Sequence, residues 1–321
     1  MNDIVFRKDF NGAGATVEIA PQETAKRYRV GAHHLARSVA SSESLPGSLE
    51  CLAVANPKMD FEEWRQHQWA GAIQCFVSSL DRDYVDHEEN YPEVHEKVLL
   101  EYAKESEMPV SGVPVGDPIK LDVPAPTSLS VVEALLRRRT TLVPSRRSLT
   151  LDELAAILYR AMARIRAFRT PAIESRPELA MTNFAPALDV YVLVFDVEGL
   201  GAGVYAYDIR NHTLTQKQGE LDRKECRRVI VGQPATETAA VTLLYVLDVE
   251  RHQWRYRHPR ALRGMWIDTA KAVNELLWEL SSRSIIPHIT PALSDTRVLE
   301  LLDLPTDMTV HAAYAVSFSG E

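Results

Sequence analysis

Four apolar runs in the second half of the chain predict the strands of a sheet. Residues 190–195 are almost continuously apolar, which is typical of a central strand buried on both faces. Further strands are predicted at residues 204–208, 239–249 and 310–317. The glycine-rich stretch 199–203 precedes a strand and not a helix, so it predicts a hairpin turn rather than a dinucleotide-binding loop.

Apolar residues at helical spacing predict helices between these strands. Ser128 and Ser130 are candidate N-caps for one helix, and Thr150 begins another with Asp152 and Glu153 in its first turn. The helical segments are predicted at residues 60–74, 81–102, 131–136, 150–162, 268–280 and 296–302. Strands and helices alternate irregularly, which favours an α+β fold over a strict parallel βαβ array.

A stretch rich in proline and glycine, residues 111–126, is the best candidate for a domain boundary. We therefore expect a mainly helical N-terminal extension at residues 1–111 and a second domain at residues 112–321. Short strands are predicted within these parts at residues 16–20 and 119–121.

Composition and charge exclude several classes of protein. Of the 321 residues 45% are hydrophobic and 25% charged, as in an ordinary globular protein, and the net charge of −8 argues against general nucleic-acid binding. No apolar run reaches membrane-spanning length, and residues 1–7 lack the apolar core of a signal peptide. Cys51, Cys75 and Cys226 are odd in number and widely spaced, which predicts reduced thiols in a cytoplasmic protein.

Basic residues concentrate in two stretches, residues 137–147 and 251–263, whereas residues 60–107 are rich in acids. In the second stretch, arginines between aromatic residues directly precede a predicted helix. This arrangement suits a phosphate or another anion, although a solvated basic turn explains the same pattern. The adjacent pair His33 and His34 cannot share one helix face, and His87 and His95 lack metal-ligand spacing, so no metal site is expected.

From about Asp117 onward, the order of segments resembles the flavin-dependent nitroreductase superfamily, and within it the SagB-type dehydrogenases of thiazolines and oxazolines in ribosomal peptides. The stretch Ala134-Leu135-Leu136-Arg137-Arg138-Arg139-Thr140 is similar to the family's ALxxRRS segment. The other similar segments are Leu149-Thr150-Leu151-Asp152-Glu153-Leu154 (LTLEEL), Asp189-Val190-Tyr191-Val192 (LEIYV), residues 200–208 (GLxPGVYxYD), Asp268, Thr269 and Asn274 (DxGHxxxNL) and Leu301-Leu302-Asp303-Leu304 (LLGLD).

The resemblance implies a nitroreductase-like fold, with a central, mostly antiparallel sheet flanked by helices, and an FMN bound between the subunits of a homodimer. Arg138, Arg139 and Thr140 would hold the FMN phosphate, together with Arg260 or Arg263, and Asn183 lies in the segment expected at the flavin ring. The family's Lys-Tyr pair corresponds to Arg255 and Tyr256.

Several positions depart from the family pattern. Leu142 replaces an arginine, Lys271 replaces a histidine, and residues 181–187 replace the small residues of PSAGALYP. Arg255 cannot exchange a proton near neutral pH, so Tyr256 becomes the candidate base with Arg255 as its electrostatic partner. The alternative for Tyr256 is an aromatic residue that packs beside the dimer core.

Two functions follow from these residues. The first is an FMN-dependent oxidoreductase that dehydrogenates a heterocycle or another peptide-derived or natural-product intermediate, alone or with other biosynthetic enzymes. The second is a nitroreductase-fold subunit that has lost flavin and serves as a binding or scaffold partner. The retained Arg138-Arg139-Thr140 favours the first, and the altered residues 181–187 and Arg255 favour the second.

Overall fold

The computed structural model describes residues 16–19, 26–31, 50–54, 91–110, 112–125, 130–176, 187–258, 260–305 and 310–321. The chain divides into two compact units, Met1–Asp83 and Tyr84–Glu321.

The described part of the first unit is an antiparallel sheet of three strands in the order β1-β2-β3. Its strands are β1 (Thr16–Ile19), β2 (Lys26–Gly31) and β3 (Glu50–Val54). The strand predicted at residues 16–20 is therefore confirmed. The helix predicted at residues 60–74, His33, His34 and His87 lie outside the described residues, so a mainly helical extension remains a prediction.

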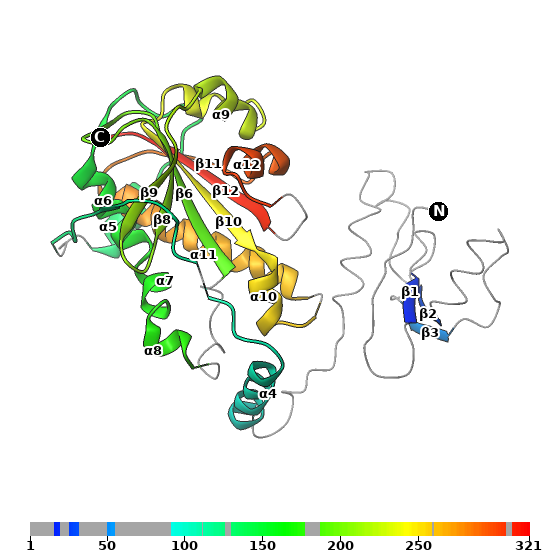
Figure 1. Cartoon of the computed structure of the whole chain (residues 1–321). Coiled ribbons are helices and arrows are strands. Elements are labelled where there is room, and N and C mark those ends of the chain that lie inside the picture. The colour runs from blue at the N-terminus through cyan, green and yellow to red at the C-terminus, as the bar shows by residue number, and fades with distance from the viewer. Residues whose placement is uncertain are drawn as a thin grey trace. The chain divides into compact units, whose positions relative to one another are not determined.

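The second unit is built around a sheet of seven strands in the order β11-β12-β10-β6-β8-β9-β4, in which all neighbouring strands are antiparallel (Figure 1). In chain order these strands are β4 (Pro118–Lys120), β6 (Leu188–Val194), β8 (Gly203–Asp208), β9 (Thr213–Gln218), β10 (Val241–Asp248), β11 (His288–Thr290) and β12 (Val310–Phe318). The continuous apolar run predicted as a central strand is β6, the fourth of the seven, and six of its seven residues are buried.

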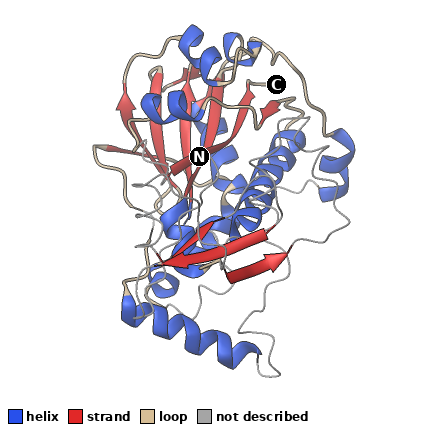
Figure 2. Cartoon of the chain, turned by 90° about the vertical axis from the view of Figure 1, so that its right-hand side faces the viewer, coloured by secondary structure: helices blue, strands red, loops and turns tan. Residues whose placement is uncertain are grey.

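Helices cover both faces of this sheet (Figure 2). On one face, Val190 and Val192 of β6 pack in a core with α6 (Leu151–Ala161) and α11 (Ala261–Ser282). On the other face, Tyr191 and Leu193 pack with α9 (Arg223–Val229) and α12 (Asp295–Leu301). Alternate residues of one strand thus enter two separate cores, which explains why its sequence is apolar throughout. The predicted α+β fold with helices on both sides of an antiparallel sheet is confirmed.

Local sequence signals account for two helix starts. Ser130 and Glu133 form a capping box at the start of α5 (Val131–Arg137), and Thr150 and Glu153 form another at the start of α6. In each box the hydroxyl accepts the backbone N–H of the glutamate, at 3.2 Å in both helices. Of the two predicted caps for α5, Ser130 is the one that is used.

Gly203 shows why the segment 200–208 contains a glycine at the start of β8. Its φ is +157°, and a Cβ atom at this position would collide with the backbone oxygen of Gln218 on the neighbouring strand β9. Only glycine lets β8 and β9 approach this closely, next to the irregular pairing between Val204 and Tyr205.

Short elements that the apolar pattern did not predict complete the unit. They are α7 (Ala163–Phe168), α8 (Pro171–Glu174), the parallel pair β5 (Leu149–Thr150) and β7 (Val197–Glu198), and the 3₁₀ helix η4 (Pro234–Glu237). The strands β9 and β11 and the helix α9 were also missed, because each has few apolar residues.

The basic stretch 251–263 differs from its prediction. Whether it binds an anion or is a solvated turn, the sequence places it before a helix that begins at Asp268. The structure instead shows the helix α10 (Val249–Arg255) and an earlier start of α11, at Ala261. The prediction placed the start of α11 too late because Ala261 to Ile267 includes Arg263 and Gly264, which do not continue the apolar stripe.

The helix α4 (Tyr91–Glu105) packs against α10 and covers part of the predicted segment 81–102. Leu99 is fully buried and shares a small core with Trp254 of α10. Trp254 Nε1 also donates to Ser106 Oγ at 3.0 Å, so α4 and α10 are joined by both apolar and polar contacts. None of the helices among the described residues is both long and apolar enough to cross a bilayer.

Candidate functional site

The first basic stretch projects from the C-terminal end of α5. Arg138 is the C-cap of this helix, and Arg138, Arg139 and Thr140 are all exposed. The Arg139 guanidinium donates to the backbone oxygens of Leu136 at 3.1 Å and Arg138 at 3.0 Å, which satisfies carbonyls that the helix end leaves open. Neither arginine forms an ion pair with a carboxylate in the part of the chain that the structure describes.

The backbone directly after these residues is fixed. Thr141 N donates to Pro287 O at 2.9 Å, and His288 Nδ1 donates to Thr141 O at 3.0 Å. His288 Nε2 lies 2.6 Å from Gln233 Oε1, and Gln233 Nε2 donates to Thr290 Oγ1 at 2.9 Å. Because His288 is buried and belongs to β11, the sheet anchors a segment whose preceding side chains remain open to solvent.

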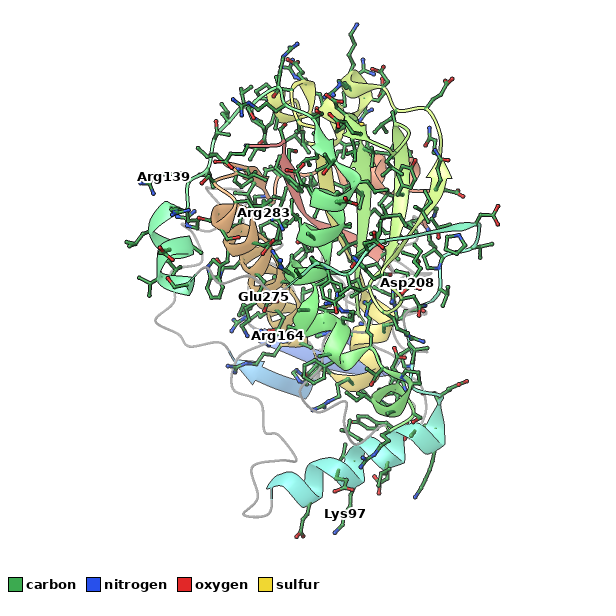
Figure 3. The ribbon with its side chains drawn as sticks, turned by 90° about the vertical axis from the view of Figure 1, so that its left-hand side faces the viewer. Lys97, Arg139, Arg164, Asp208, Glu275 and Arg283 are labelled. Carbon is green, nitrogen blue, oxygen red and sulfur yellow. The ribbon has the colours of Figure 1, made fainter. Side chains whose placement is uncertain are left out.

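This stretch lies at the C-terminal end of α11. Ser281 Oγ, in the last turn of α11, donates to Ala134 O of α5. Figure 3 shows Arg139 near the end of α11 that precedes Arg283. Arg138, Arg139 and Thr140 are consecutive residues, and their role as a phosphate site stays a prediction.

Two arginines of the second basic stretch, Arg251 and Arg257, are neutralised by acids. Arg251 pairs with Asp189 of β6 and, at 2.7 Å, with Asp248 at the end of β10. Burial lowers the pKa of Arg251, but the charges and hydrogen bonds of Asp189 and Asp248 outweigh burial and raise the pKa above its ordinary value. Arg257 pairs with Glu105 of α4, and its guanidinium carbon lies 3.5 Å from the centre of the Tyr102 ring.

Tyr256, the candidate base, is the C-cap of α10 and lies among cationic and aromatic neighbours. The Arg255 guanidinium carbon is 4.5 Å from the centre of its ring, and the His252 and His258 rings are centred 4.8 Å and 6.3 Å away. Burial lowers the pKa of His252 to about 4, so this imidazole is neutral at pH 7, with Nε2 3.2 Å from Ala261 O. The predicted pair Arg255 and Tyr256 is in direct contact.

The structure does not bring all predicted site residues to one place in one chain. Arg260 is the N-cap of α11 and Arg263 lies in its first turn, whereas Arg138 and Arg139 lie at its other end. A helix of 22 residues is about 33 Å long, which is too far for one phosphate to touch both groups. Arg260 and Arg263 therefore join Arg138 and Arg139 only if a second copy of the chain supplies one of the two groups.

The departures from the family pattern have different surroundings. Leu142, where the family has an arginine, is 63% exposed, and Lys271 pairs with Asp268 at 2.8 Å on α11. Asn183 and its neighbours at residues 181–186 lie outside the described residues, so their predicted place at the flavin ring stays a prediction.

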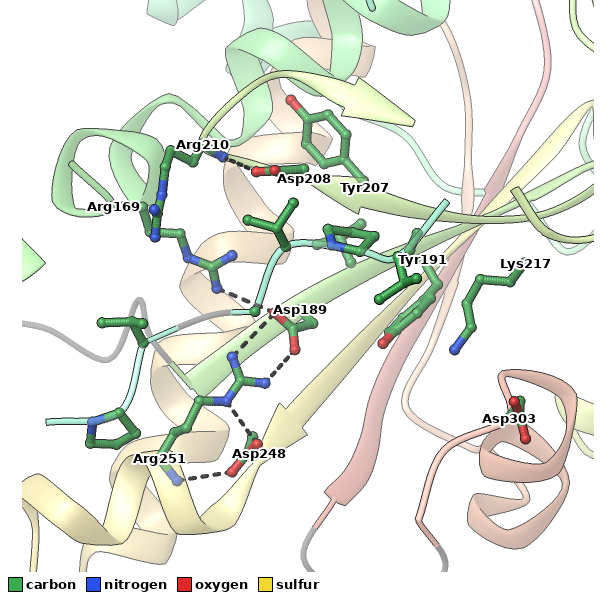
Figure 4. A pocket seen from close by; sticks show the side chains of 18 residues that line it. Arg169, Asp189, Tyr191, Tyr207, Asp208, Arg210, Lys217, Asp248, Arg251 and Asp303 are labelled. Atoms are coloured by element: carbon green, nitrogen blue, oxygen red, sulfur yellow. Dashed lines mark hydrogen bonds and ion pairs between the residues drawn. The ribbon is translucent and has the colours of Figure 1, made fainter. Parts of the chain in front are cut away.

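A cavity of about 610 Å³ lies at the end of the sheet where β6 begins and β8 and β10 end (Figure 4). One wall is a chain of alternating charges, because Arg169 lies 3.6 Å from Asp189, Asp189 pairs with Arg251, and Arg251 pairs with Asp248. Burial lowers the pKa of Arg169 to about 10, partly offset by the Asp189 charge. The opposite side is formed by Tyr191, Lys217 and Asp303.

The residues of this cavity were not predicted as a site. They come from four strands, from α10, from the ends of α7 and α12, and from the loop before β4, and no motif joins them in the sequence. One sequence feature could have pointed to the cavity. A single acid flanks each of two apolar runs, Asp189 at the start of β6 and Asp248 at the end of β10. These acids become neighbours only once β6 and β10 are known to pair antiparallel.

Comparisons with known proteins give two relatives in sequence. No protein-family model matches the chain. The chain is 24% identical over 194 residues to the trifolitoxin operon protein TfxC of Rhizobium leguminosarum bv. trifolii, which covers 58% of this chain and 54% of TfxC. It is also 24% identical over 192 residues to MJ1384 of Methanocaldococcus jannaschii, a protein named as a nitroreductase, which covers 59% of this chain and 92% of MJ1384.

The chain thus spans about half the length of TfxC. Among solved structures it resembles a chain of the E. coli microcin synthetase McbBCD complex with truncated pro-MccB17 bound. The identity is 16%, the TM-score is 0.44, and the likeness covers 72% of this chain and 94% of that chain. The sequence relatives match over a length close to that of the predicted second domain. The resemblance to the nitroreductase superfamily that the sequence motifs predicted is confirmed, and the Tyr84–Glu321 unit has a nitroreductase-like fold.

Proposed function

We propose that the chain is an FMN-dependent oxidoreductase that works as a homodimer and dehydrogenates a heterocycle or another peptide-derived intermediate. The observation that carries the proposal is the first basic stretch. Arg138 and Thr140 point to solvent from a backbone fixed by Thr141 and His288, and no carboxylate neutralises the arginines within the described residues. Two exposed guanidinium groups on a rigid segment fit a phosphate that needs charge-assisted hydrogen bonds.

Exposed large apolar side chains support the homodimer. Nine large apolar side chains on α5, on the segment after it, on the first turns of α11 and just before β11 are exposed by 37–71%: Val132, Leu135, Leu136, Leu142, Val143, Leu262, Trp266, Ile267 and Ile286. Large apolar side chains gathered on neighbouring helices are an expected feature of an interface between subunits. A two-fold axis across the middle of α11 would pair the two copies of this helix in opposite directions.

That arrangement would also complete the site. It would place Tyr256, Arg260 and Arg263 of one copy next to Arg138 and Arg139 of the other, across the interface between the two α11 helices. The distance that separates the two groups in one chain is then an expected property of a site shared between subunits.

The protein side of the reaction follows from the candidate residues. When bound, FMN supplies the acceptor for a hydride. Arg138, Arg139 and Thr140 would fix the phosphate and so the position of the cofactor. Tyr256 would remove the substrate proton, with the Arg255 guanidinium over its ring stabilising the negative charge that develops. The name of TfxC, which refers to the trifolitoxin operon, supports a place in natural-product biosynthesis beside other enzymes.

The second candidate function is a flavin-free binding or scaffold subunit. It is favoured by exposed Leu142 where the family has an arginine, and by Arg255, whose guanidinium contacts an aromatic ring and cannot shuttle a proton near neutral pH.

Colour distinguishes the two functions. The purified full chain is expected to absorb in the flavin bands, or to take up added FMN with one flavin per chain. Heat-released flavin identified as FMN would support the enzyme. A colourless protein that quenches no FMN fluorescence at micromolar concentration would contradict the enzyme and leave the scaffold function.

A further inference from the structure

We propose that the cavity between Tyr191, Lys217 and the Arg169–Asp189–Arg251–Asp248 wall binds a ligand that presents a carboxylate to Lys217 and Tyr191. The cavity lies apart from Arg138 and Arg139, the candidate phosphate-binding arginines of the same chain. Asp189 and Asp248 lie toward one end of the sheet, whereas His288 pairs with Ser317 at the other end, next to Thr242 of β10. Thr242 and Asp248 are about 20 Å apart along that strand.

The charges of the cavity wall explain why Lys217 is the group that meets an anion. Arg169 and Arg251 share Asp189, Arg251 also holds Asp248, and Arg210 pairs with Glu174 outside the cavity. Asp208 accepts the backbone N–H groups of Arg210 at 2.9 Å and Asn211 at 3.0 Å. Lys217 is the lining cation that forms no ion pair within the described residues.

Tyr191 supplies the second donor. Its side chain is 9% exposed, and its hydroxyl forms no hydrogen bond among the described residues. Burial and the nearby Asp189 charge raise the pKa of Tyr191, which keeps the phenol protonated. The Lys217 Nζ atom lies 5.7 Å from the centre of the Tyr191 ring, so the ammonium and the hydroxyl are close enough to serve one carboxylate (Figure 4).

The remaining lining determines the ligand's charge and shape. The side chains of Arg169, Arg210, Lys217 and Arg251 are balanced by four aspartates, Asp189, Asp208, Asp248 and Asp303. A neutral cavity accommodates one added negative charge better than the two of a phosphate. Val113, Pro114 and Val115 form an apolar part of the lining, and a volume of about 610 Å³ is in the range of small-molecule sites. A carboxylate beside a small apolar group, from a free acid or a peptide C-terminus, fits this lining.

The test is binding to the purified full chain without added flavin, measured by ligand-detected NMR titration. The probes are N-acetyl-leucine, its neutral amide N-acetyl-leucinamide, and the peptide acetyl-Ala-Ala-Leu with a free C-terminus. We expect both acids to bind about tenfold more tightly than the amide, which is the effect of one charge-assisted contact. If the peptide binds more tightly than N-acetyl-leucine, the ligand of the cavity is a peptide C-terminus. If the two bind equally, the ligand is a small acid.

Variants of the lining separate this site from non-specific attraction. Lys217→Gln is expected to abolish the preference for acid over amide, and Tyr191→Phe to weaken the acid about threefold. Asp303→Asn should tighten it about twofold by removing a like charge. Lys224→Gln, an equal charge change at an exposed position of α9, should leave binding unchanged. Equal affinity for acid and amide, or a preference that survives in Lys217→Gln with an unchanged melting temperature, would overturn the proposal.

Discussion

The two basic stretches of the chain look alike in sequence but differ in their surroundings. Around Arg251 and Arg257, carboxylates from β6, β10 and α4 neutralise the guanidinium groups and tie α10 to the sheet and to α4. Around Arg138 and Arg139, no carboxylate of the described residues approaches, and the anchored part is the backbone. The first arrangement stabilises the fold, and the second leaves positive charge available to a ligand.

A count of arginines in a sequence does not show which acids the fold places beside them. Asp189 lies 62 positions before Arg251, and Glu105 lies 152 positions before Arg257. Only the fold brings these acids to the second stretch. The denser cluster is therefore the weaker candidate for anion binding, and four measurements can break or sharpen this comparison.

The largest effect is expected from Arg251→Gln. The substitution leaves Asp189 and Asp248 partly buried without their shared partner, so the free energy of unfolding should fall by about 3 kcal/mol. Urea unfolding of the variant and the wild type measures the change. The control is Arg228→Gln, which removes an exposed pair with Glu225 and should cost less than about 0.5 kcal/mol. Equal effects of the two substitutions would contradict the structural role of Arg251.

The double variant Arg138→Gln/Arg139→Gln should show the opposite behaviour. FMN affinity is expected to fall about 100-fold, or about 2.7 kcal/mol, because two charge-assisted contacts to the phosphate are lost. The melting temperature should stay the same, since both side chains are exposed. Fluorescence titration with FMN measures the affinity, and Arg297→Gln, at an exposed position of α12, is the matched control. Unchanged FMN affinity in the double variant would remove the phosphate site from Arg138 and Arg139.

Buried His252 should make the second region sensitive to acid. Burial lowers the pKa of His252 from 6.5 to about 4. Between these two pH values the imidazole is protonated in the unfolded chain and neutral in the folded chain. The stability is intact above about pH 6.5 and falls as the pH decreases toward 4, by about 2 kcal/mol at pH 5. Urea unfolding at pH 7 and pH 5 measures this loss. His252→Phe should reduce the pH dependence by that amount, and an identical pH dependence in the variant would contradict the burial of a neutral imidazole.

The smallest effect is expected from Arg257→Gln. This arginine is partly exposed, so loss of its pair with Glu105 and its contact with the Tyr102 ring should cost about 1 kcal/mol. Arg257→Lys should recover part of the stability through its remaining charge. If Arg257→Gln unfolds at the same urea concentration as the wild type, Arg257 does not stabilise the contact between α4 and α10. That contact would then depend on Leu99 and Trp254.

The sequence predicted the strands with continuous apolar runs because both faces of β6 and β10 are buried. It missed β9 and β11, which are short or polar, and α10, because Arg251 and Arg255 interrupt the apolar stripe expected of a helix. Arg138, Arg139 and Thr140 could be grouped because they are adjacent. The wide separation of Arg260 from Arg138 could not be predicted, since it depends on the full length of α11 and on its packing against α5.

The central claim is that Arg138 and Arg139 hold the phosphate of a flavin. It is tested most directly by comparing the affinities of FMN and riboflavin, which differ only in that phosphate, for the wild-type protein and the double variant. We expect the wild type to bind FMN at least about 100-fold more tightly than riboflavin, and the variant to bind both alike. Equal affinities in the wild type, or a preference for FMN that the variant retains, would contradict the claim.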